Sequence, residues 1–335
     1  MLLVFAGICL TGIILVCRQR GPSSQAEFVL GTVCTVNLYD QGRTGVYQEI
    51  FSRFREIETR MSAVSPETEL DRINANAGIE PVLVHADVFD VIELAVRYAE
   101  LSGGAFDPTV GPLVSLWGVS GDHPRLPSLE EIDALLPLVG WRDVDLDRSG
   151  LTVFLKRPGM ALDLGAVAKG YAADEAARIL RENRINRAII DLGGNILAYG
   201  EKKDRSPWRI GIQNPLDNRG AYVGIVELRD KTAVTSGVYE RYFEAGGVRY
   251  HHILSPATGY PVWNGLLSVT IVASRSADAD ALSTAAFVLG YEKGKEMIES
   301  LDGVAGIFIF EDQSIRLCGG AVFILTDETY RIISG

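Results

Sequence analysis

Apolar residues recur at three- and four-residue steps in several parts of the chain, which is the period of an amphipathic helix. The first such segment places Val46, Ile50, Phe54, Ile57 and Met61 on one face. The same pattern predicts longer helices over residues 86–102, 166–183, 277–289 and 292–301. Two short helices are expected to begin at capping residues, one at Thr68 with Asp71 and one at Ser128 with Glu131.

Runs rich in β-branched and aromatic residues predict strands, and these become dense in the second half of the chain. The expected strands cover residues 28–39, 143–147, 151–155, 160–164, 187–192, 195–199, 208–213, 222–229, 248–254, 266–273, 304–310, 314–318 and 321–325. No linker-like composition divides residues 27–335, and no repeat is visible. We therefore predict an α+β fold in one compact unit, of one or two lobes.

The first 17 residues differ from the rest because they are apolar apart from Thr11. A helix of this length reaches about 25 Å at ~1.5 Å per residue, just short of a bilayer core. The stretch Ile14-Leu15-Val16-Cys17 is similar to a loose lipobox with Cys17 as the acylated residue, although Val16 stands where a smaller residue is usual. A lipoprotein signal and an uncleaved anchor are both compatible with this pattern.

With either a lipoprotein signal or an uncleaved anchor, we predict residues 1–17 as signal, residues 18–26 as a polar tether and residues 27–335 as the folded part. The folded part is then expected on the extracytoplasmic face of a bacterial inner membrane, in the periplasm. If Cys9 is cleaved away and Cys17 is lipidated, Cys34 and Cys318 are left. Both lie in strand-like, half-apolar runs, so we expect two buried thiols, although an oxidising compartment would allow a disulfide.

Composition narrows the class of protein further. Apolar residues make up 47% of the 335, charged residues 22%, and the net charge is −11. These values are typical of a globular protein with a core. The acidic balance, with no basic block, argues against nucleic-acid binding.

The usual short catalytic motifs are absent from the sequence, including H-E-x-x-H, C-x-x-C, G-x-S-x-G and G-x-G-x-x-G. Instead, Gly-rich polar junctions stand at the ends of predicted elements, where backbone amides can approach a ligand. They occupy residues 104–118, 162–174, 190–195, 235–237, 251–259 and 276–285.

Two of these junctions suggest specific chemistry. Asp163 and Lys169 flank a predicted helix start, which favours an anion, although these two residues taken alone are more often a plain ion pair at a helix start. Asp280 and Thr284 are four residues apart, so on a helix their oxygens face the same way. Such hard oxygens suit magnesium completed by water and phosphate, whereas acids at a helix start need no metal.

Taken together and in order, these segments resemble the ApbE family, the FAD:protein FMN transferases. The resemblance runs from L-G-T at residues 30–32 to the end of the chain. Its motifs are M-S at 61–62 with T-E-L at 68–70 and Asn74, G-x-F-D-P-T-V-G-P-L-V from 104, D-L-G-x-x-A-K-G-Y-A-A-D from 163, L-G-G-N from 192, T-S-G from 235, H-I-x-x-P-x-T-G from 252 and A-D-A-L-S-T-A from 279. It implies a T-fold-like α+β architecture.

The resemblance also implies the reaction. Such enzymes bind FAD with Mg²⁺, cleave its pyrophosphate, attach FMN through a phosphoester to a Ser or Thr of a target protein, and release AMP. Their acceptors are extracytoplasmic flavoproteins of electron-transport complexes with a D-G-x-[ST]-G-A-[ST]-like motif.

By position in the motifs, the resemblance assigns roles to individual residues. The implied magnesium ligands are the Ala166 carbonyl, Asp280 and Thr284, with Ser283 as a further candidate. The implied catalytic residues are Asp280 and His252, the latter as the base for the acceptor hydroxyl, whereas His251 matches no motif and is expected to be an ordinary strand residue. The implied FAD-binding residues are Leu30, Val64, Ala105, Phe106, Asp107, Asp163, Lys169 and Ile253.

Val64 is a departure, because many members have a tyrosine there. If that ring stacks on the flavin or adenine, about 1 kcal/mol of stacking is lost in this chain. A magnesium-dependent FAD pyrophosphatase that releases FMN and AMP is therefore an alternative. A non-catalytic FAD-binding or storage lipoprotein is another, although the presence of Asp280, Thr284 and His252 favours an enzyme.

Overall fold

The computed structural model describes residues 23–40, 44–63, 65–119, 121 and 123–333. The predicted signal over residues 1–17, with Cys17, and the predicted FAD-binding residue Val64 lie outside the described residues. Among the residues described, no helix combines the length and the apolar character needed to cross a membrane.

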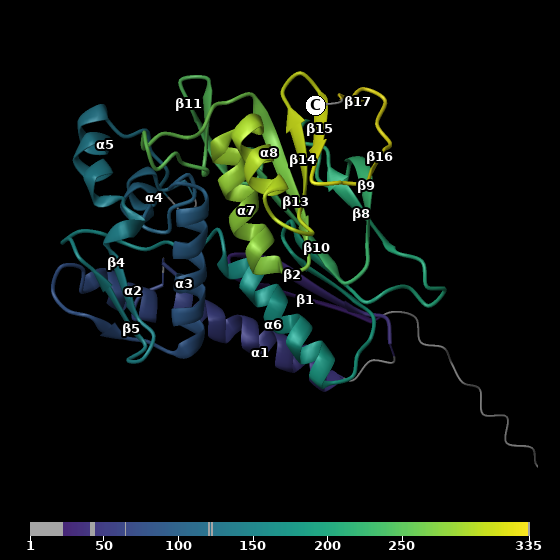
Figure 1. The fold of residues 1–335 in the computed structure, drawn as a ribbon, viewed down its shortest axis with the longest axis horizontal. Helices are drawn as coiled ribbons and strands as arrows, with labels where there is room; N and C mark the ends of the chain where they lie inside the picture. The colour runs from purple at the N-terminus through teal and green to yellow at the C-terminus, as the bar shows by residue number, and fades with distance from the viewer. Residues whose placement is uncertain (1–22, 41–43, 64, 120, 122, 334–335) are drawn as a thin grey trace, which may run out of the picture.

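A nine-stranded sheet forms the centre of the molecule (Figure 1). Its strand order is β1-β2-β6-β7-β10-β13-β14-β15-β17, and only the last pair is parallel. The strands are β1 (Ser23–Val29), β2 (Thr32–Leu38), β6 (Ala188–Leu192), β7 (Asn195–Tyr199), β10 (Lys231–Gly237), β13 (Leu266–Ala273), β14 (Ala305–Phe310), β15 (Ser314–Cys318) and β17 (Arg331–Ile332). Every residue of β13 is buried, which indicates that this strand is covered on both faces.

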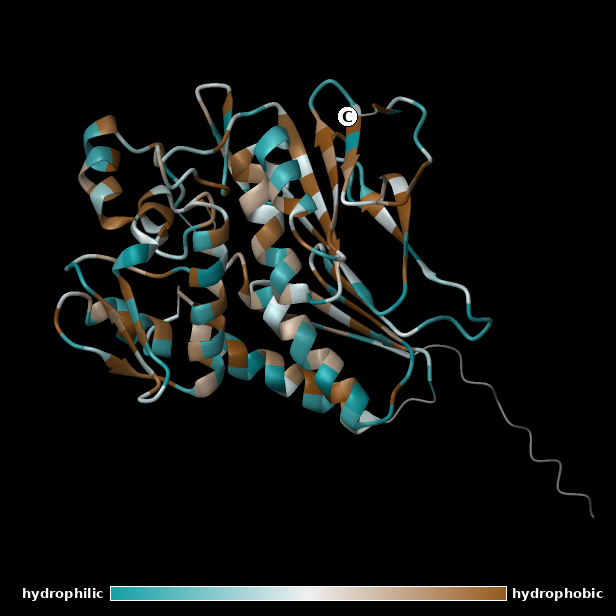
Figure 2. Cartoon of the chain, in the orientation of Figure 1, coloured by the Kyte–Doolittle hydropathy of each residue, from teal (hydrophilic) through white to brown (hydrophobic). Residues whose placement is uncertain are grey.

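Each face of the sheet carries its own layer. One face packs against α1 (Thr44–Met61), α6 (Ala168–Glu182), α7 (Ser276–Leu289) and α8 (Tyr291–Glu299) around the main apolar core. The other face packs against a small sheet of β8 (Trp208–Gln213), β9 (Tyr222–Leu228) and β16 (Phe323–Leu325) around a second core. Figure 2 shows brown apolar residues along the central strands and alternating bands on α1 and α6, as amphipathic helices require.

The remaining elements lie beyond the helical layer, on the left in Figure 1. They are α2 (Glu69–Ala75), α3 (Ala86–Leu101), α4 (Gly111–Trp117), α5 (Leu129–Leu135), the short 3₁₀ helices Leu136–Leu138 and Trp141–Asp143, and a sheet of β3 (Val82–Leu83), β5 (Thr152–Leu155) and β4 (Val144–Asp147). A separate hairpin of β11 (Tyr242–Ala245) and β12 (Val248–His251) stands above them. The predicted α+β class is confirmed.

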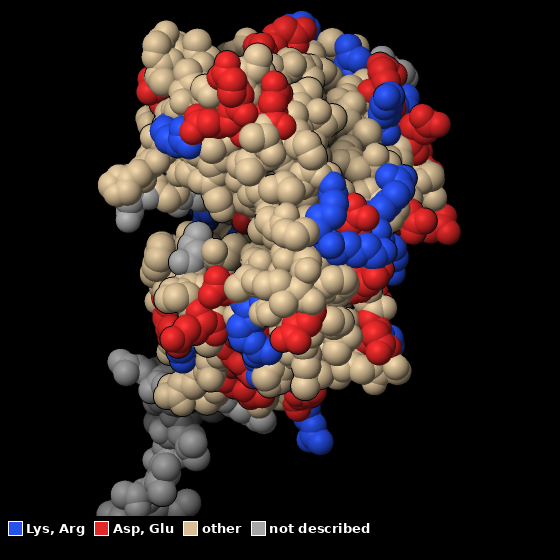
Figure 3. Space-filling model, turned by 90° about the vertical axis from the view of Figure 1, so that its left-hand side faces the viewer, with Lys and Arg blue, Asp and Glu red and all other residues tan. Residues whose placement is uncertain are grey.

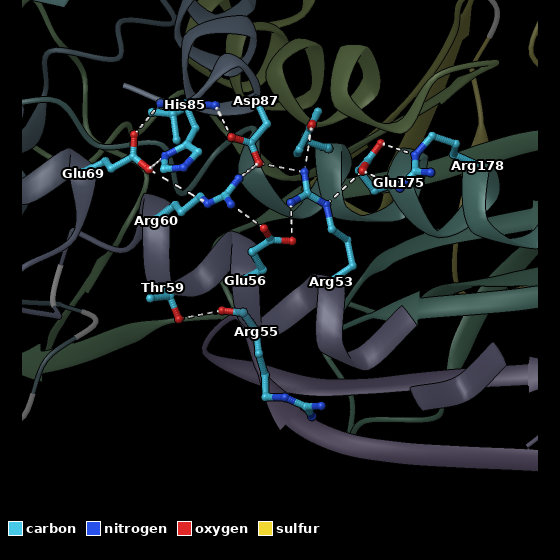
Figure 4. A network of polar contacts seen from close by, with 12 residues as sticks. Arg53, Arg55, Glu56, Thr59, Arg60, Glu69, His85, Asp87, Glu175 and Arg178 are labelled. Atoms are coloured by element: carbon cyan, nitrogen blue, oxygen red, sulfur yellow. Dashed lines mark hydrogen bonds and ion pairs between the residues drawn. The ribbon is translucent and has the colours of Figure 1, made fainter. Parts of the chain in front are cut away.

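A polar network joins α1 to its neighbours on the side shown in Figure 4. Arg53 of α1 bonds to Glu56 (2.7 Å), to Asp87 of α3 (2.8 Å) and to Glu175 of α6 (2.9 Å). Arg60, two turns further along α1, also bonds to Asp87 at 2.6 Å. These contacts hold the pKa of Asp87 below its usual value against the opposing effect of burial. The network therefore fixes α1 relative to α3 and α6.

The capping residues are confirmed. Thr68 accepts a hydrogen bond from the backbone of Asp71, and Ser128 forms a complete capping box with Glu131. Cys34 and Cys318 are free, buried thiols, as expected, and burial raises their pKa values to about 12 and about 11.

Three expectations near the chain start and before α6 are wrong. Residues 28–39 form two strands, because Leu30 and Gly31 both have positive φ and close a tight hairpin turn. Residues 23–26 belong to β1 and pair with β2, so they are not part of a tether. Every second side chain of residues 160–164 is buried, as in a strand, but the segment forms no strand. The reason is that the side chain of Asn74 hydrogen-bonds to both the N–H and the carbonyl of Leu162.

Candidate functional site

One cleft of about 600 Å³ gathers the predicted segments. The cleft lies where the left-hand elements of Figure 1 meet the central sheet. Its lining comes from the β1–β2 turn, α1, the segments before α4 and α6, β10, the two ends of the β11–β12 hairpin, and α7. The predicted residues that line it are Leu30, Ala105, Phe106, Asp107, Asp163, Ala166, Lys169, His252, Ile253, Asp280 and Thr284. A second hollow of about 530 Å³, beside Tyr39 and Trp208, holds none of them.

The surface view gives the charge pattern around this region. On the face shown in Figure 3, a gap runs inward between the upper and lower parts, and acidic and basic side chains stand together in separate groups on a surface that is otherwise uncharged. Inside the cleft both signs also meet, because Lys169, Arg219 and Arg241 share its lining with Asp163 and Asp280. The cleft can therefore hold an anionic ligand and a cation side by side.

The start of α6 is built around a hydrogen bond from a distant residue. Gly170 is the third residue of α6, so its N–H is one of the amides at a helix start that have no acceptor within the helix. Here it donates to Oδ2 of Asp280 at 2.8 Å. Ala166 precedes the helix and lines the cleft, and no hydrogen bond within the described residues reaches its carbonyl.

Close packing of α6 on α7 makes this arrangement possible. A Cβ added to Gly170 would lie 2.3 Å from the carbonyl oxygen of Ser276 and 2.6 Å from Cα of Ala277. Only glycine lets the two helix starts approach this closely. Asp280 is 4% exposed, and burial raises the pKa of its carboxyl, with Lys169 and the Gly170 N–H acting in the opposite direction.

Thr284 lies one turn after Asp280 on α7 and shares the cleft lining, as predicted. Its hydroxyl is 3.1 Å from Ser236 Oγ of β10. Ser283 differs: it is buried, donates to the carbonyl of Asp280 at 2.9 Å, contacts Ser236 Oγ at 2.8 Å, and does not line the cleft. The structure therefore uses Ser283 inside the protein and brings the other three implied ligands together.

These donors fit a hard cation. The Ala166 carbonyl, the Asp280 carboxylate and the Thr284 hydroxyl supply three oxygens and one negative charge. The described residues contain no group of three or more His, Cys, Asp or Glu that could hold a metal ion. Water and ligand phosphates would have to complete the coordination, as is usual for magnesium.

The segment before α6 holds the second predicted pair. Asp163 Oδ1 accepts from the N–H of Gly165 at 2.8 Å, and burial raises the pKa of this carboxyl. Lys169 donates to the carbonyl of Gly165 at 3.3 Å and lines the cleft. Asp163 and Lys169 thus both bond to the backbone of Gly165, and the lysine supplies a positive charge to the cleft.

The two adjacent histidines have different environments. His251 is buried; its Nε2 donates to the carbonyl of Val262 at 2.9 Å, and its Nδ1 accepts from the N–H of Ile253 at 3.2 Å. Both ring nitrogens are therefore used inside the protein. Burial lowers the pKa of His251 to about 4, so the ring is neutral and structural.

His252 is half-buried and lines the cleft. Its Nδ1 lies 3.2 Å from the carbonyl of Arg241 and must be the donor, which leaves Nε2 as an acceptor with no hydrogen bond in the described part of the chain. Burial, together with the positive charges of Arg241 and Lys169, lowers the pKa of His252 to about 3. The ring is neutral at pH 7, so the lone pair of Nε2 is available to a ligand.

Asp107 lines the cleft, but its carboxylate is used mainly to hold the surrounding loop. Oδ1 accepts from the N–H and the hydroxyl of Thr109 at 2.8 and 2.6 Å, and Oδ2 accepts from the N–H of Trp141 at 3.1 Å. Burial raises the pKa of this carboxyl. Asp107 therefore shapes the wall that Ala105 and Phe106 present to the cleft.

Several lining residues were not identified from the sequence. Arg219, Glu240, Arg241, Ser236 and Asn195 all line the cleft. Ser236 and Asn195 belong to the T-S-G and L-G-G-N motifs, so the sequence pointed to both positions but gave neither residue a role. Arg219 lies in a loop with no periodicity, and Glu240 and Arg241 precede β11, so the sequence offered no signal for these three.

Comparison with known proteins gives a consistent result. A model of the ApbE family matches residues 30–308. The chain is 40% identical to an FAD:protein FMN transferase of Treponema pallidum, covering 89% of this chain and 87% of that protein, and 36% identical to one of Klebsiella pneumoniae, covering 88% and 91%. Among solved structures, it is similar to the ApbE protein of Thermotoga maritima (TM-score 0.80, 33% identity, 92% and 97% covered) and to the flavin transferase ApbE from Vibrio cholerae (TM-score 0.77, 29% identity, 92% and 98% covered).

Proposed function

The chain belongs to the ApbE family, and we propose that it is a magnesium-dependent FAD:protein FMN transferase. The observation that carries this proposal is the cleft itself. It brings an unpartnered carbonyl (Ala166), a carboxylate (Asp280) and a hydroxyl (Thr284) together with Lys169 and a neutral His252. A cation site, a positive charge and a base are what phosphoryl transfer from a pyrophosphate requires.

The residues then have distinct roles in the reaction. Bound magnesium would neutralise pyrophosphate charge and polarise the phosphorus that is attacked. Nε2 of His252 takes the proton of the acceptor Ser or Thr hydroxyl, whose oxygen forms a bond to the FMN phosphorus. The bond from that phosphorus to the bridging oxygen breaks, and AMP leaves with the electron pair. Lys169 stabilises the negative charge that develops on the phosphoryl oxygens.

Hydrolysis of FAD to FMN and AMP is a second candidate, because position 64 carries valine. The residues on either side, Ala63 and Ser65, line the cleft, and a valine side chain offers no ring on which flavin or adenine could stack. Water would then take the place of the acceptor hydroxyl. The two activities share every step except the identity of the nucleophile.

The test is to incubate the purified protein with FAD and MgCl₂, with and without an acceptor that carries a D-G-x-[ST]-G-A-[ST]-like segment, and to measure AMP release and acceptor mass. We expect an FMN-sized gain on the acceptor that requires magnesium. AMP and free FMN with no mass gain would make hydrolysis the main activity. Tight FAD retention with no AMP would instead support a storage protein.

A matched pair of variants tests the cation site. Asp280→Ala removes a metal ligand and is expected to abolish AMP release. Asp278→Ala changes the same residue type two positions earlier on α7, where it pairs with Arg97 and Arg275 outside the cleft lining. That variant should keep its activity. Full activity in Asp280→Ala would refute the assignment.

We also propose that the protein works on the extracytoplasmic face of a bacterial inner membrane, anchored at Cys17, on membrane-associated flavoproteins. The support is the apolar stretch of residues 1–17 and the lipobox-like residues that end it. Mass spectrometry of the membrane-extracted protein tests this proposal. We expect a diacylglyceryl-sized gain on Cys17 that Cys17→Ser abolishes, and an unmodified Cys17 would refute acylation.

A further inference from the structure

Asp174 of α6 ends the D-L-G-x-x-A-K-G-Y-A-A-D motif, yet it has no role in the proposed reaction. Its carboxylate accepts two hydrogen bonds from the backbone at the start of α7, from the N–H of Ser276 at 2.8 Å and from the N–H of Ala277 at 3.1 Å. Burial raises the pKa of Asp174 to about 6, with these two N–H groups acting in the opposite direction, so the carboxylate is charged at pH 7. The dipole of α7 favours a negative charge at this end, so Asp174 caps α7 from another helix.

The start of α6 is capped by α7 in return. The N–H of Gly170 donates to Oδ2 of Asp280 at 2.8 Å, so each helix supplies an aspartate to the other. Within the described residues neither helix has a side-chain cap from the residue before it, which is Val167 for α6 and Arg275 for α7. The first N–H groups of a helix need acceptors from outside it. The reciprocal aspartates supply them, and they thereby fix the two helix starts against each other.

The proposed cation site spans these two helices. The Ala166 carbonyl belongs to the segment that leads into α6, whereas Asp280 and Thr284 are residues of α7. The distance from the carbonyl to the other two donors therefore depends on how α6 and α7 are placed against each other. Magnesium requires near-ideal octahedral geometry, so a displacement of one helix weakens its binding.

A displacement at the start of α7 reaches both donors of that helix. Asp280 and Thr284 follow Ser276 by four and eight residues, which is about 6 and about 12 Å along a regular helix. The hydroxyl of Ser276 bonds to Thr232 of β10 at 2.6 Å, which ties α7 to the sheet. Asp174 adds the tie to α6, the helix that follows the Ala166 carbonyl.

We propose that Asp174 is a positioning residue for the divalent cation. By holding the start of α7 on α6, it keeps the two α7 donors at the distance from the Ala166 carbonyl that the cation requires. Asp174 does not line the cleft, so it acts through Asp280 and Thr284 and does not bind the cation itself. This rests on the proposed function, which places a cation there.

Asp174→Asn tests the proposal, because asparagine has the same shape but one acceptor oxygen in place of two. The purified protein without FAD is titrated with MnCl₂ and followed by electron paramagnetic resonance, since manganese accepts the same oxygen ligands as magnesium. We expect binding to weaken by about tenfold, as is typical when a group that orients a metal ligand is removed. With FAD and saturating MgCl₂, the rate of AMP release should approach that of the wild type, because every donor is still present.

Two controls separate positioning from charge and from stability. Asp278→Asn removes a negative charge from the same first turn of α7 and should leave Mn²⁺ affinity unchanged. Asp40→Asn changes a carboxylate that also accepts from two consecutive backbone N–H groups, those of Asn186 at 2.5 Å and Arg187 at 3.1 Å, outside the cleft. It should lower the urea midpoint, as Asp174→Asn does, without weakening Mn²⁺ binding.

Hydrogen exchange of the wild-type protein gives a second test that needs no variant. Coupling between two sites is reciprocal, so bound Mn²⁺ should slow the exchange of the Ser276 and Ala277 N–H groups. Equal exchange with and without MnCl₂, in a protein that binds Mn²⁺, would overturn the proposal even if Asp174→Asn did not fold.

The titrations distinguish failure of this proposal from failure of the proposed function. Wild-type Mn²⁺ affinity in a folded Asp174→Asn would overturn the proposal and leave the proposed function intact. An equal loss of affinity in Asp278→Asn would also overturn it, because charge alone would then explain the effect. A wild-type protein that does not bind Mn²⁺ would overturn both.

Discussion

Gly170→Ala is expected to destabilise the protein although alanine is the better helix former. Within a helix the change from glycine to alanine stabilises by about 1 kcal/mol. At Gly170, however, the new Cβ would lie 2.3 Å from the carbonyl oxygen of Ser276, whereas ordinary contacts begin at 3.4 Å. The obstructing atoms belong to the backbone of α7, so no side-chain rotation can relieve the clash. The two helices would have to separate by about 1 Å.

The cost of that separation exceeds the gain in helix propensity. Overpacking of this kind costs about 1–3 kcal/mol. The hydrogen bond from Gly170 N–H to the Asp280 carboxylate, 2.8 Å long, would weaken at a further cost of about 1.5–3 kcal/mol. Set against a gain of about 1 kcal/mol, the net loss is about 3 kcal/mol. The same movement displaces Asp280, so magnesium-dependent AMP release should fall as well.

Urea unfolding of the purified protein measures this change. With an m-value of about 3 kcal/mol/M, the midpoint of Gly170→Ala should fall by about 1 M. Gly45→Ala is the matched control: Gly45 is also near a helix start, in α1, and a Cβ there meets nothing within 4 Å. That variant should gain up to about 1 kcal/mol. A Gly170→Ala midpoint equal to or above that of the wild type would refute the close packing of α6 on α7.

Three further changes have expected results. His252→Gln should lower FMN transfer by about 100-fold or more while FAD binding persists, measured by acceptor mass and FAD titration; unchanged transfer would exclude His252 as the base. In the folded state His251 stays neutral down to about pH 4, whereas in the unfolded chain it takes up a proton below about pH 6.5. The free energy of unfolding therefore falls as the pH drops through this window, and His251 accounts for about 3 kcal/mol of the loss. Urea midpoints at pH 7 and pH 5 should show this loss, and an equal loss in His251→Gln would contradict it. Arg53→Met leaves two half-buried carboxylates, Asp87 and Glu175, one partner short and should cost about 2 kcal/mol. Arg55→Met, at a side chain 53% exposed, should cost under about 0.5 kcal/mol. Equal urea midpoints in the two variants would argue against the role of the network.

The sequence by itself determined the features that depend on neighbours along the chain. The apolar face of α1, the cap at Thr68 and the capping box at Ser128 each involve residues three or four apart, so the local pattern was sufficient to predict them. The same holds for the spacing of Asp280 and Thr284 on one face of α7. The ordered motifs also identified the segments that line the cleft, and the match of the ApbE family model to residues 30–308 agrees with them.

Contacts between distant residues were decided only by the tertiary structure. The segment Lys231–Gly237 contains a turn-like T-S-G, yet it is the strand β10, because β7 and β13 pair with it on both sides. Residues 160–164 alternate as a strand does, but an asparagine side chain 88 positions away takes the hydrogen bonds of Leu162.

The functional roles depend on the tertiary structure in the same way. His251 and His252 are adjacent in the sequence, and only the structure shows that both ring nitrogens of His251 are bonded inside the protein whereas His252 keeps Nε2 unbonded within the described residues. The N–H of Gly170 has no acceptor within α6, and the side chain that accepts from it, Asp280, lies 110 positions further along the chain. A local pattern records which groups a residue carries, whereas packing across the fold decides which of those groups are already bonded and which are left for a ligand.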